Sequence, residues 1–109
     1  MAKETWVRVV IYENSADDPK ATEKYLQHTA DKVLGVFQKT KGCKFGYWAQ
    51  DPNSGRMAAI TYWENPESIE RAKSALEQVQ KEREDLGIKV AFESNFMVSK
   101  MGQFTNPWA

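Results

Sequence analysis

The sequence predicts a single α+β domain in which two helices cover one face of a four-stranded antiparallel sheet. One observation behind this prediction is the order of the apolar patterns, which runs strand, helix, strand, strand, helix, strand. Another is that the two halves of the chain resemble each other. Each half has a strand, an Asp-Pro or Asn-Pro helix start, a helical stripe and a closing glycine, and the spacing from the proline to the closing glycine is similar in the two halves, Pro19 to Gly42 and Pro66 to Gly87.

The first half is predicted to contain one strand and one helix. The strand runs from Thr5 to Glu13, and alternation divides its side chains between two faces, with Val7, Val9 and Ile11 on one and Trp6, Arg8, Val10 and Tyr12 on the other. After a polar loop, the helix runs from about Pro19 to about Thr40. Its apolar stripe consists of Leu26, Ala30, Val33, Leu34 and Phe37.

The second half opens with a predicted hairpin. Strands Cys43–Gln50 and Met57–Trp63 flank Asp51–Gly55, a dense turn signal that is short enough to pair them antiparallel. Asn65 then caps a single long helix that starts at Pro66. Its apolar stripe consists of Ile69, Ala72, Leu76, Val79 and Leu86.

A last strand is predicted from Ile88 to about Ser99. The complete order is the split-βαβ, ferredoxin-like pattern, in which crossover helices pack on one face of the sheet. We assign this domain to residues 1–100 and a C-terminal tail to residues 101–109. The tail contains Phe104, Pro107 and Trp108, so we weigh two alternatives, a segment that folds over a cleft or a partner and a disordered end.

Composition excludes several classes of function. Fifteen basic and fifteen acidic residues cancel, so no net field attracts nucleic acid or an anionic membrane. RNA-recognition modules share the predicted strand order, but Met57 and Ile60 stand where such a module has a glycine and a stacking ring. Cys43 is the only cysteine, and no apolar run approaches the ~20 residues of a membrane span. We therefore expect a cytoplasmic protein without nucleic-acid or membrane partners.

Both faces of the predicted sheet carry large apolar side chains, although two helices can cover only one. A monomer rarely leaves such a wide apolar patch in water. A second copy of the same sheet is the simplest cover, because two-fold homodimers are the commonest assembly. We therefore expect a homodimer packed sheet to sheet.

Few residues have the pattern of a catalytic or metal site. His28 is the only histidine, and helical geometry places it on the solvent side, away from the apolar stripe. No His/Cys cluster with metal-ligand spacing occurs in the sequence, so we expect no metal and no cofactor. Cys43 is interpreted as a small core residue.

The aromatic residues are more informative, since the chain has five Phe, four Trp and four Tyr. Core and interface packing explains most such rings, and the alternative is an aromatic pocket between helices and sheet that suits a planar ligand. Arg83 occupies a position of the second helical stripe, where it is either a snorkelling side chain or an anchor for an anionic ligand.

The sequence also resembles a known family. Gly42 before an aromatic strand, the Asp51–Gly55 turn and the segment Ile60–Ser68, which ends a strand with Thr-Tyr-Trp-Glu and opens a helix, are similar to the antibiotic-biosynthesis-monooxygenase-like branch of the dimeric α/β-barrel proteins. The resemblance covers roughly residues 5 to 100. It implies a ferredoxin-like protomer, a sheet-to-sheet dimer and a ligand cleft in each protomer between helices and sheet.

The resemblance also allows the known activities to be compared residue by residue. Trp63 matches the strand-end tryptophan of the cofactor-free monooxygenases of aromatic polyketides, and Trp48 stands where they have an aromatic hydroxyl. Ala59 and Ile69 replace their asparagine and tyrosine. For haem-degrading relatives, Glu82 stands at the position of the histidine ligand, and a carboxylate does not replace a neutral imidazole on haem iron.

We therefore interpret the chain as a small-molecule-binding dimeric α/β-barrel protein that acts as a cofactor-independent monooxygenase on an aromatic or hydrophobic substrate. The alternative is a non-catalytic, stress-responsive or ligand-sequestering dimer. The candidate ligand-binding residues are Trp63, Trp48, Tyr62, Arg83 and Asn14. Because sheet faces alternate, Tyr62 and Trp63 cannot both point into one cleft.

Overall fold

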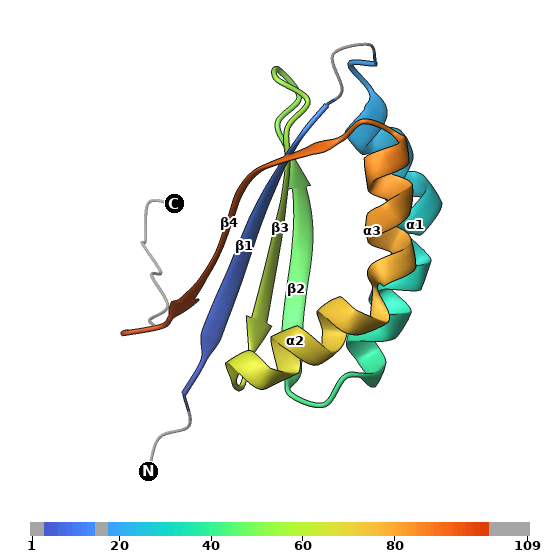
Figure 1. The fold of residues 1–109 in the computed structure, drawn as a ribbon. Helices are drawn as coiled ribbons and strands as arrows, with labels where there is room; N and C mark the ends of the chain where they lie inside the picture. The colour runs from blue at the N-terminus through green and yellow to red at the C-terminus, as the bar shows by residue number, and fades with distance from the viewer. Residues whose placement is uncertain (1–3, 15–17, 101–109) are drawn as a thin grey trace, which may run out of the picture.

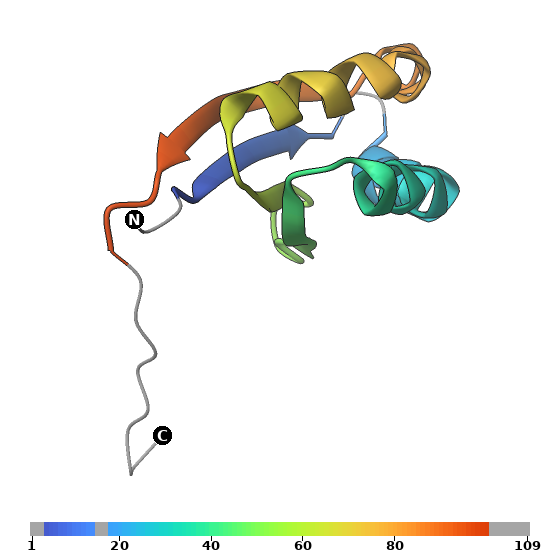
Figure 2. The same ribbon diagram turned by 90° about the horizontal axis from the view of Figure 1, so that it is seen from below.

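The computed structural model describes residues 4–14 and 18–100 of the chain, and its strands form one four-stranded sheet. In chain order its elements are β1 (Trp6–Glu13), α1 (Ala21–Lys39), β2 (Cys43–Gln50), β3 (Met57–Trp63), α2 (Pro66–Ala75), α3 (Glu77–Asp85) and β4 (Lys89–Met97). All three helices lie on the same side of the sheet (Figures 1 and 2). The predicted α+β, ferredoxin-like fold is confirmed. The predicted tail, with Phe104, Pro107 and Trp108, lies outside the described residues.

The sheet has the strand order β2-β3-β1-β4, and every neighbouring pair is antiparallel. The central strand β1 pairs with β3 on one side, where Arg8 lies opposite Thr61, and with β4 on the other, where Val10 lies opposite Glu93. The predicted hairpin is also confirmed. Its turn is closed by the backbone N–H of Asp51, which donates to the carbonyl of Arg56 at 2.8 Å.

The single long helix predicted after Pro66 is wrong, because the structure breaks it into α2 and α3 at Leu76. Leu76 has φ −105° and ψ 14°, and its N–H donates to the carbonyl of Lys73, three residues back. The chain changes direction there (Figure 1). Ile69 and Ala72 of α2 therefore pack in the apolar cluster around Trp63, whereas Val79 of α3 packs in the other apolar cluster of the core. The apolar spacing is compatible with either shape, so periodicity could not reveal the break.

The core lies between the sheet and the helices in these two clusters. The first contains Ala21, Tyr25, Val33, Met57, Val79 and Ile88, and the second contains Trp63, Ile69 and Ala72. Phe37 of α1 packs against both clusters and so connects them. The two clusters are therefore joined through α1.

The opposite side of the sheet, called the open face below, carries no helix (Figure 2). Alternation from the helix-facing residues assigns to it Val7, Val9, Ile11, Phe45, Tyr47, Ile60, Tyr62, Phe92 and Phe96. Several of these side chains are largely exposed, among them Phe45 at 55% and Phe96 at 46%. The second apolar face predicted from the sequence is thus present and uncovered in a single chain.

The sequence also led us to expect no membrane-spanning segment and no metal site. In the part of the chain that the structure describes, no helix combines the length and apolar character that crossing a membrane requires. Within residues 4–14 and 18–100, no group of three or more His, Cys, Asp or Glu side chains is placed to hold a metal ion.

Candidate functional site

A cavity of about 290 Å³ lies between the helix-facing side of the sheet and the three helices. Its floor is made by alternate residues of the central strands, Arg8, Val10 and Tyr12 from β1 and Met57, Ala59, Thr61 and Trp63 from β3. Residues of α1, α2 and α3 form the opposite wall. The volume is at the lower end of the range of about 300–1,000 Å³ that ligand pockets span. The fold thus places a small-molecule-sized cavity where the two halves of the chain meet.

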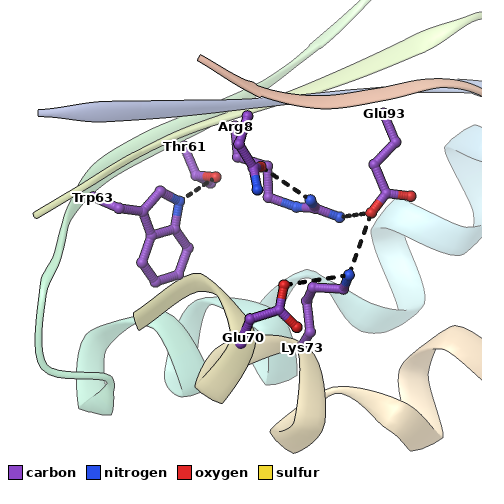
Figure 3. Close-up of polar contacts among 7 residues, drawn as sticks. Arg8, Thr61, Trp63, Glu70, Lys73 and Glu93 are labelled. Carbon is purple, nitrogen blue, oxygen red and sulfur yellow. Dashed lines mark hydrogen bonds and ion pairs between the residues drawn. The ribbon is translucent and has the colours of Figure 1, made fainter. Parts of the chain in front are cut away.

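One end of the cavity is aromatic. The Phe37 ring of α1 stacks on Trp48 with centroids 6.2 Å apart and meets Trp63 edge to face with centroids 5.5 Å apart. Trp63 is only 1% exposed, so its ring is held on all sides. Its indole Nε1–H donates to the hydroxyl of Thr61 at 2.8 Å (Figure 3). These rings give this end of the cavity an aromatic lining, in which Phe37 and Trp48 are half-buried and Trp63 is enclosed.

A series of ion pairs links β1, β4 and α2 along the same cavity (Figure 3). The Arg8 guanidinium bonds to the Glu93 carboxylate, and the Lys73 ammonium lies 3.6 Å from the same carboxylate oxygen. Lys73 also lies 3.8 Å from Glu70 of its own helix. The hydrogen bond from Arg8, more than any other influence, holds the pKa of Glu93 below its usual range. Glu93 is therefore ionised at neutral pH and is a weak base.

A second polar region lies where α3 crosses the end of β1. The guanidinium carbon of Arg83 lies 5.4 Å from the centre of the Tyr12 ring, and the buried Nε of Arg83 has no hydrogen-bond partner among the described residues. Burial raises the pKa of Tyr12, although the nearby Arg83 pulls it the other way. Burial also raises the pKa of Tyr25, to about 12. Both phenols are therefore neutral at pH 7.

These groups determine what the cavity can do chemically. Three basic side chains and one carboxylate line it, namely Arg8, Lys73, Arg83 and Glu93. Glu93 is already paired with Arg8 and Lys73, whereas Arg83 has no carboxylate partner within residues 4–14 and 18–100. The arrangement is therefore suited to binding and orienting an aromatic ligand with an anionic or acceptor group, rather than to strong acid–base chemistry.

Three of the residues proposed from the sequence line the cavity, namely Trp63, Trp48 and Arg83. Tyr62 does not, because the alternation of β3 places it on the open face, where it stacks on Phe45 with centroids 4.4 Å apart. Asn14 also lies elsewhere. Its side-chain oxygen accepts hydrogen bonds from the backbone N–H and the hydroxyl of Thr22, both at 2.9 Å, so it ties the end of β1 to the first turn of α1.

The other chemically interesting residues lie outside the cavity lining. His28 is exposed on α1, as its helical position predicted. Cys43 packs against the cluster of Trp63, and burial raises the pKa of its thiol, which fits the interpretation as a core residue.

Sequence reasoning missed several polar residues of the cavity, among them Arg8, Tyr12, Thr61, Lys73 and Glu93. A usable signal existed for the first three, because Arg8 and Tyr12 share a strand face with buried Val10, and Thr61 shares one with Trp63. Lys73 and Glu93 are polar residues on a helix and an edge strand. Only the packing of α2 over β4 brings them together.

No protein-family model matches the sequence, and no curated protein matches it. Solved structures do match in fold. MupZ from Pseudomonas fluorescens superposes with a TM-score of 0.70 at 8% identity, over 87% of this chain and 69% of that one. A protein from Deinococcus radiodurans, provisionally identified as an antibiotic biosynthesis monooxygenase, has a TM-score of 0.62 at 14% identity, over 93% and 96% of the two chains.

A third structure, from Nitrosomonas europaea and with the same provisional identification, has a TM-score of 0.64 at 10% identity, over 93% of this chain and 94% of that one. Identities this low show a shared fold and do not transfer an activity. The resemblance seen in the sequence is thereby confirmed at the level of architecture: the chain has the fold of the antibiotic-biosynthesis-monooxygenase-like structures.

Proposed function

We propose that the protein binds a small aromatic or hydrophobic molecule with an anionic or phenolic group in this cavity and oxidises it as a cofactor-independent monooxygenase. The observation that carries the proposal is the pairing of an aromatic wall, Trp48 and Trp63, with the buried and unpartnered Nε of Arg83. Flat rings favour a planar ligand, and a buried guanidinium N–H without an acceptor favours an anion. The site residues of this proposal are Trp63, Trp48 and Arg83.

The chemistry proposed for this cavity needs only the substrate and dioxygen. When an electron-rich aromatic compound has its reacting CH₂ group oxidised to C=O, one oxygen atom of O₂ enters the product, the other leaves as water, and the substrate itself supplies the electrons. The chain's own contribution is to hold the ring against Trp63 and Trp48, to stabilise an enolate or phenolate beside Arg83, and to exclude water.

We further propose that the protein works as a cytoplasmic homodimer. The open face supports this, since Phe45, Tyr47, Phe92 and Phe96 are all between 45% and 55% exposed in the single chain. A continuous apolar surface of this kind is unfavourable in water and is covered most simply by its own copy. Two sheets packed face to face would remove it from solvent.

Oxygen uptake tests the catalytic part. Purified protein is mixed with anthrone, whose ring CH₂ group becomes the C=O of anthraquinone, in an oxygen electrode, and the uncatalysed rate is subtracted. We expect uptake above background for the wild type and for Tyr47→Phe, a control on the open face, and a loss of most of it in Trp63→Phe. Circular dichroism verifies that Trp63→Phe is folded. Wild-type uptake equal to background would contradict the catalytic proposal.

A second candidate function is a non-catalytic, ligand-sequestering dimer. It is favoured by the state of Glu93, the only carboxylate in the cavity lining, which is engaged by both Arg8 and Lys73 and so is a poor base. Tight binding of anthrone without oxygen uptake would support this function over the enzymatic one.

A further inference from the structure

Thr61 holds its side chain in a defined orientation. A β-carbon added at Gly46, on the neighbouring strand, would lie 2.8 Å from the Thr61 methyl carbon, so the methyl group occupies the space that the glycine leaves. The hydroxyl is thereby turned toward Trp63, whose indole N–H donates to it at 2.8 Å. Figure 3 shows the two side chains next to each other on β3. Since Thr61 is only 5% exposed, its other rotamers are restricted by packing.

This hydrogen bond leaves the hydroxyl with an unused proton. A threonine hydroxyl has one donor and two acceptor positions, and the indole uses one acceptor position. No acceptor for the Thr61 hydroxyl proton occurs among residues 4–14 and 18–100, although the side chain lines the cavity. A buried hydroxyl with a spare donor is expected to find a partner in whatever fills the cavity.

The same contact removes the indole N–H of Trp63 from ligand recognition. Its single donor is spent on Thr61, so Trp63 presents only its ring to the cavity. Donation from the indole also polarises the Thr61 hydroxyl and makes it a better donor.

From this geometry we infer that Thr61 is the specificity-determining residue that donates a hydrogen bond to a carbonyl or oxyanion oxygen on the ring held against Trp63. The inference rests on the proposed function, because it concerns the ligand of the same cavity. It limits the ligand class to aromatic compounds that carry an acceptor oxygen on or next to the ring.

The proposed hydrogen bond from Thr61 to the ligand is tested with two matched ligands and two matched variants. The ligands are 1-tetralone and tetralin, which share a bicyclic skeleton and differ in one carbonyl group. Thr61→Val removes the hydroxyl while keeping the shape, and Thr61→Ser keeps the hydroxyl. Affinities are measured by tryptophan fluorescence, and the ratio of the two dissociation constants is compared between proteins. We expect Thr61→Val to shift this ratio against 1-tetralone by about two- to tenfold, the range expected for one hydrogen bond, and Thr61→Ser to leave it unchanged.

A second readout separates recognition from a merely structural role. In 1-tetralone labelled with ¹³C at the carbonyl, the bound signal in the wild type should move downfield from its position in cyclohexane, as a hydrogen-bonded carbonyl does. Because Arg8, Lys73 and Arg83 also line the cavity, the shift is assigned to Thr61 if it is kept in Thr61→Ser and lost in Thr61→Val, or in Thr61→Ala should Thr61→Val not fold.

The outcomes differ for the two proposals. Equal weakening of both ligands in Thr61→Val, or a bound carbonyl signal at its cyclohexane position, would overturn the role of Thr61 and leave the aromatic cavity intact. Failure of the wild type to bind 1-tetralone at millimolar concentration while it binds 2-naphthoate would overturn the role of Thr61 alone, and failure to bind 1-tetralone, tetralin and 2-naphthoate would overturn the proposed function with it.

Discussion

The guanidinium carbon of Arg83 lies 5.4 Å from the centre of the Tyr12 ring, so a cation of α3 is held over an aromatic side chain of the central strand. The two residues are far apart in the sequence, and neither is part of a recognisable motif. Both residues line the cavity, and the buried Nε of Arg83 has no hydrogen-bond partner among the described residues. We therefore use Arg83 to test the proposed binding of an anionic ligand.

Replacing Arg83 by methionine should weaken binding of anionic aromatic ligands and spare neutral ones. Methionine retains an apolar stem for packing but removes the charge. A hydrogen bond to a charged group contributes about 1.5–3 kcal/mol, so the affinity for 2-naphthoate should fall by about tenfold to a hundredfold while that for naphthalene stays nearly constant. Isothermal titration measures both. Arg56→Met is the matched control, because Arg56 is exposed, pairs with Glu13 and lies outside the cavity lining. Equal affinities for 2-naphthoate in wild type and Arg83→Met would refute the assignment.

Replacing Asn14 by alanine should destabilise the fold without changing ligand affinity. The substitution leaves the backbone N–H of Thr22, a fully buried residue, without its acceptor. A buried unsatisfied donor costs about 1–3 kcal/mol, which urea unfolding can measure. Asn53→Ala, in the exposed hairpin turn, should change stability by no more than about 0.5 kcal/mol. A stable Asn14→Ala protein with lost ligand binding would return Asn14 to the site.

The ion pairs that Glu93 forms with Arg8 and Lys73 should make the free energy of unfolding depend on pH in the acid range. Arg8 lowers the pKa of Glu93 in the folded protein below the ordinary value of 4.5, so the folded state holds the ionised form more strongly than the unfolded state does. The stabilisation is complete above that ordinary pKa and is lost as the pH falls through the lowered, folded-state pKa.

Urea unfolding of Glu93→Gln between about pH 6 and pH 3 should therefore show a weaker fall in unfolding free energy than the wild type. Some dependence will remain, because hydrogen bonds also lower the pKa of Asp18 and of Asp51. Asp51→Asn serves as a comparison, and its effect should add to that of Glu93→Gln because the two sites share no partner. Identical pH profiles for wild type and Glu93→Gln would show that the ion pair contributes nothing.

Placing a charge in the middle of the open face should prevent dimer formation. Val9 lies on the central strand between Ile60 and Ser94, so a carboxylate there would be buried without a partner in a sheet-to-sheet dimer. Light scattering should give a dimeric mass for the wild type at micromolar concentration and a monomeric mass for Val9→Glu. Gln38→Glu, exposed on α1, should remain dimeric. A monomeric wild type would remove the dimer proposal.

Much of the fold was predictable because its signals are local. The turn at Asp51–Gly55 specifies a hairpin through its own residues, and Asn65 caps α2 as predicted, accepting from the Ser68 N–H at 2.9 Å. The break at Leu76 was not predictable, because one residue leaving the helical conformation does not disturb the spacing of apolar side chains.

Only part of the candidate site could be predicted from the sequence, because packing between distant segments brings its residues together. Trp63 and Trp48 are large rings on strands, which are expected somewhere in a core or a pocket. Tyr62 is chemically as suitable as Trp63, and it stands only one position away. Asn14 was a reasonable polar candidate until its oxygen proved to be engaged by Thr22.

By itself, the sequence determined the order of the elements, the antiparallel sheet and the division of each strand's side chains into two sets, because hydrophobic period and turn chemistry are properties of neighbouring residues. The tertiary structure alone decided which set faces the helices, since that depends on how the crossovers pack on the sheet. That choice places Trp63, Thr61 and Arg8 in the cavity and Tyr62 on the open face. It also brings α2 over β4 and α3 over β1, contacts between distant segments that no local pattern encodes.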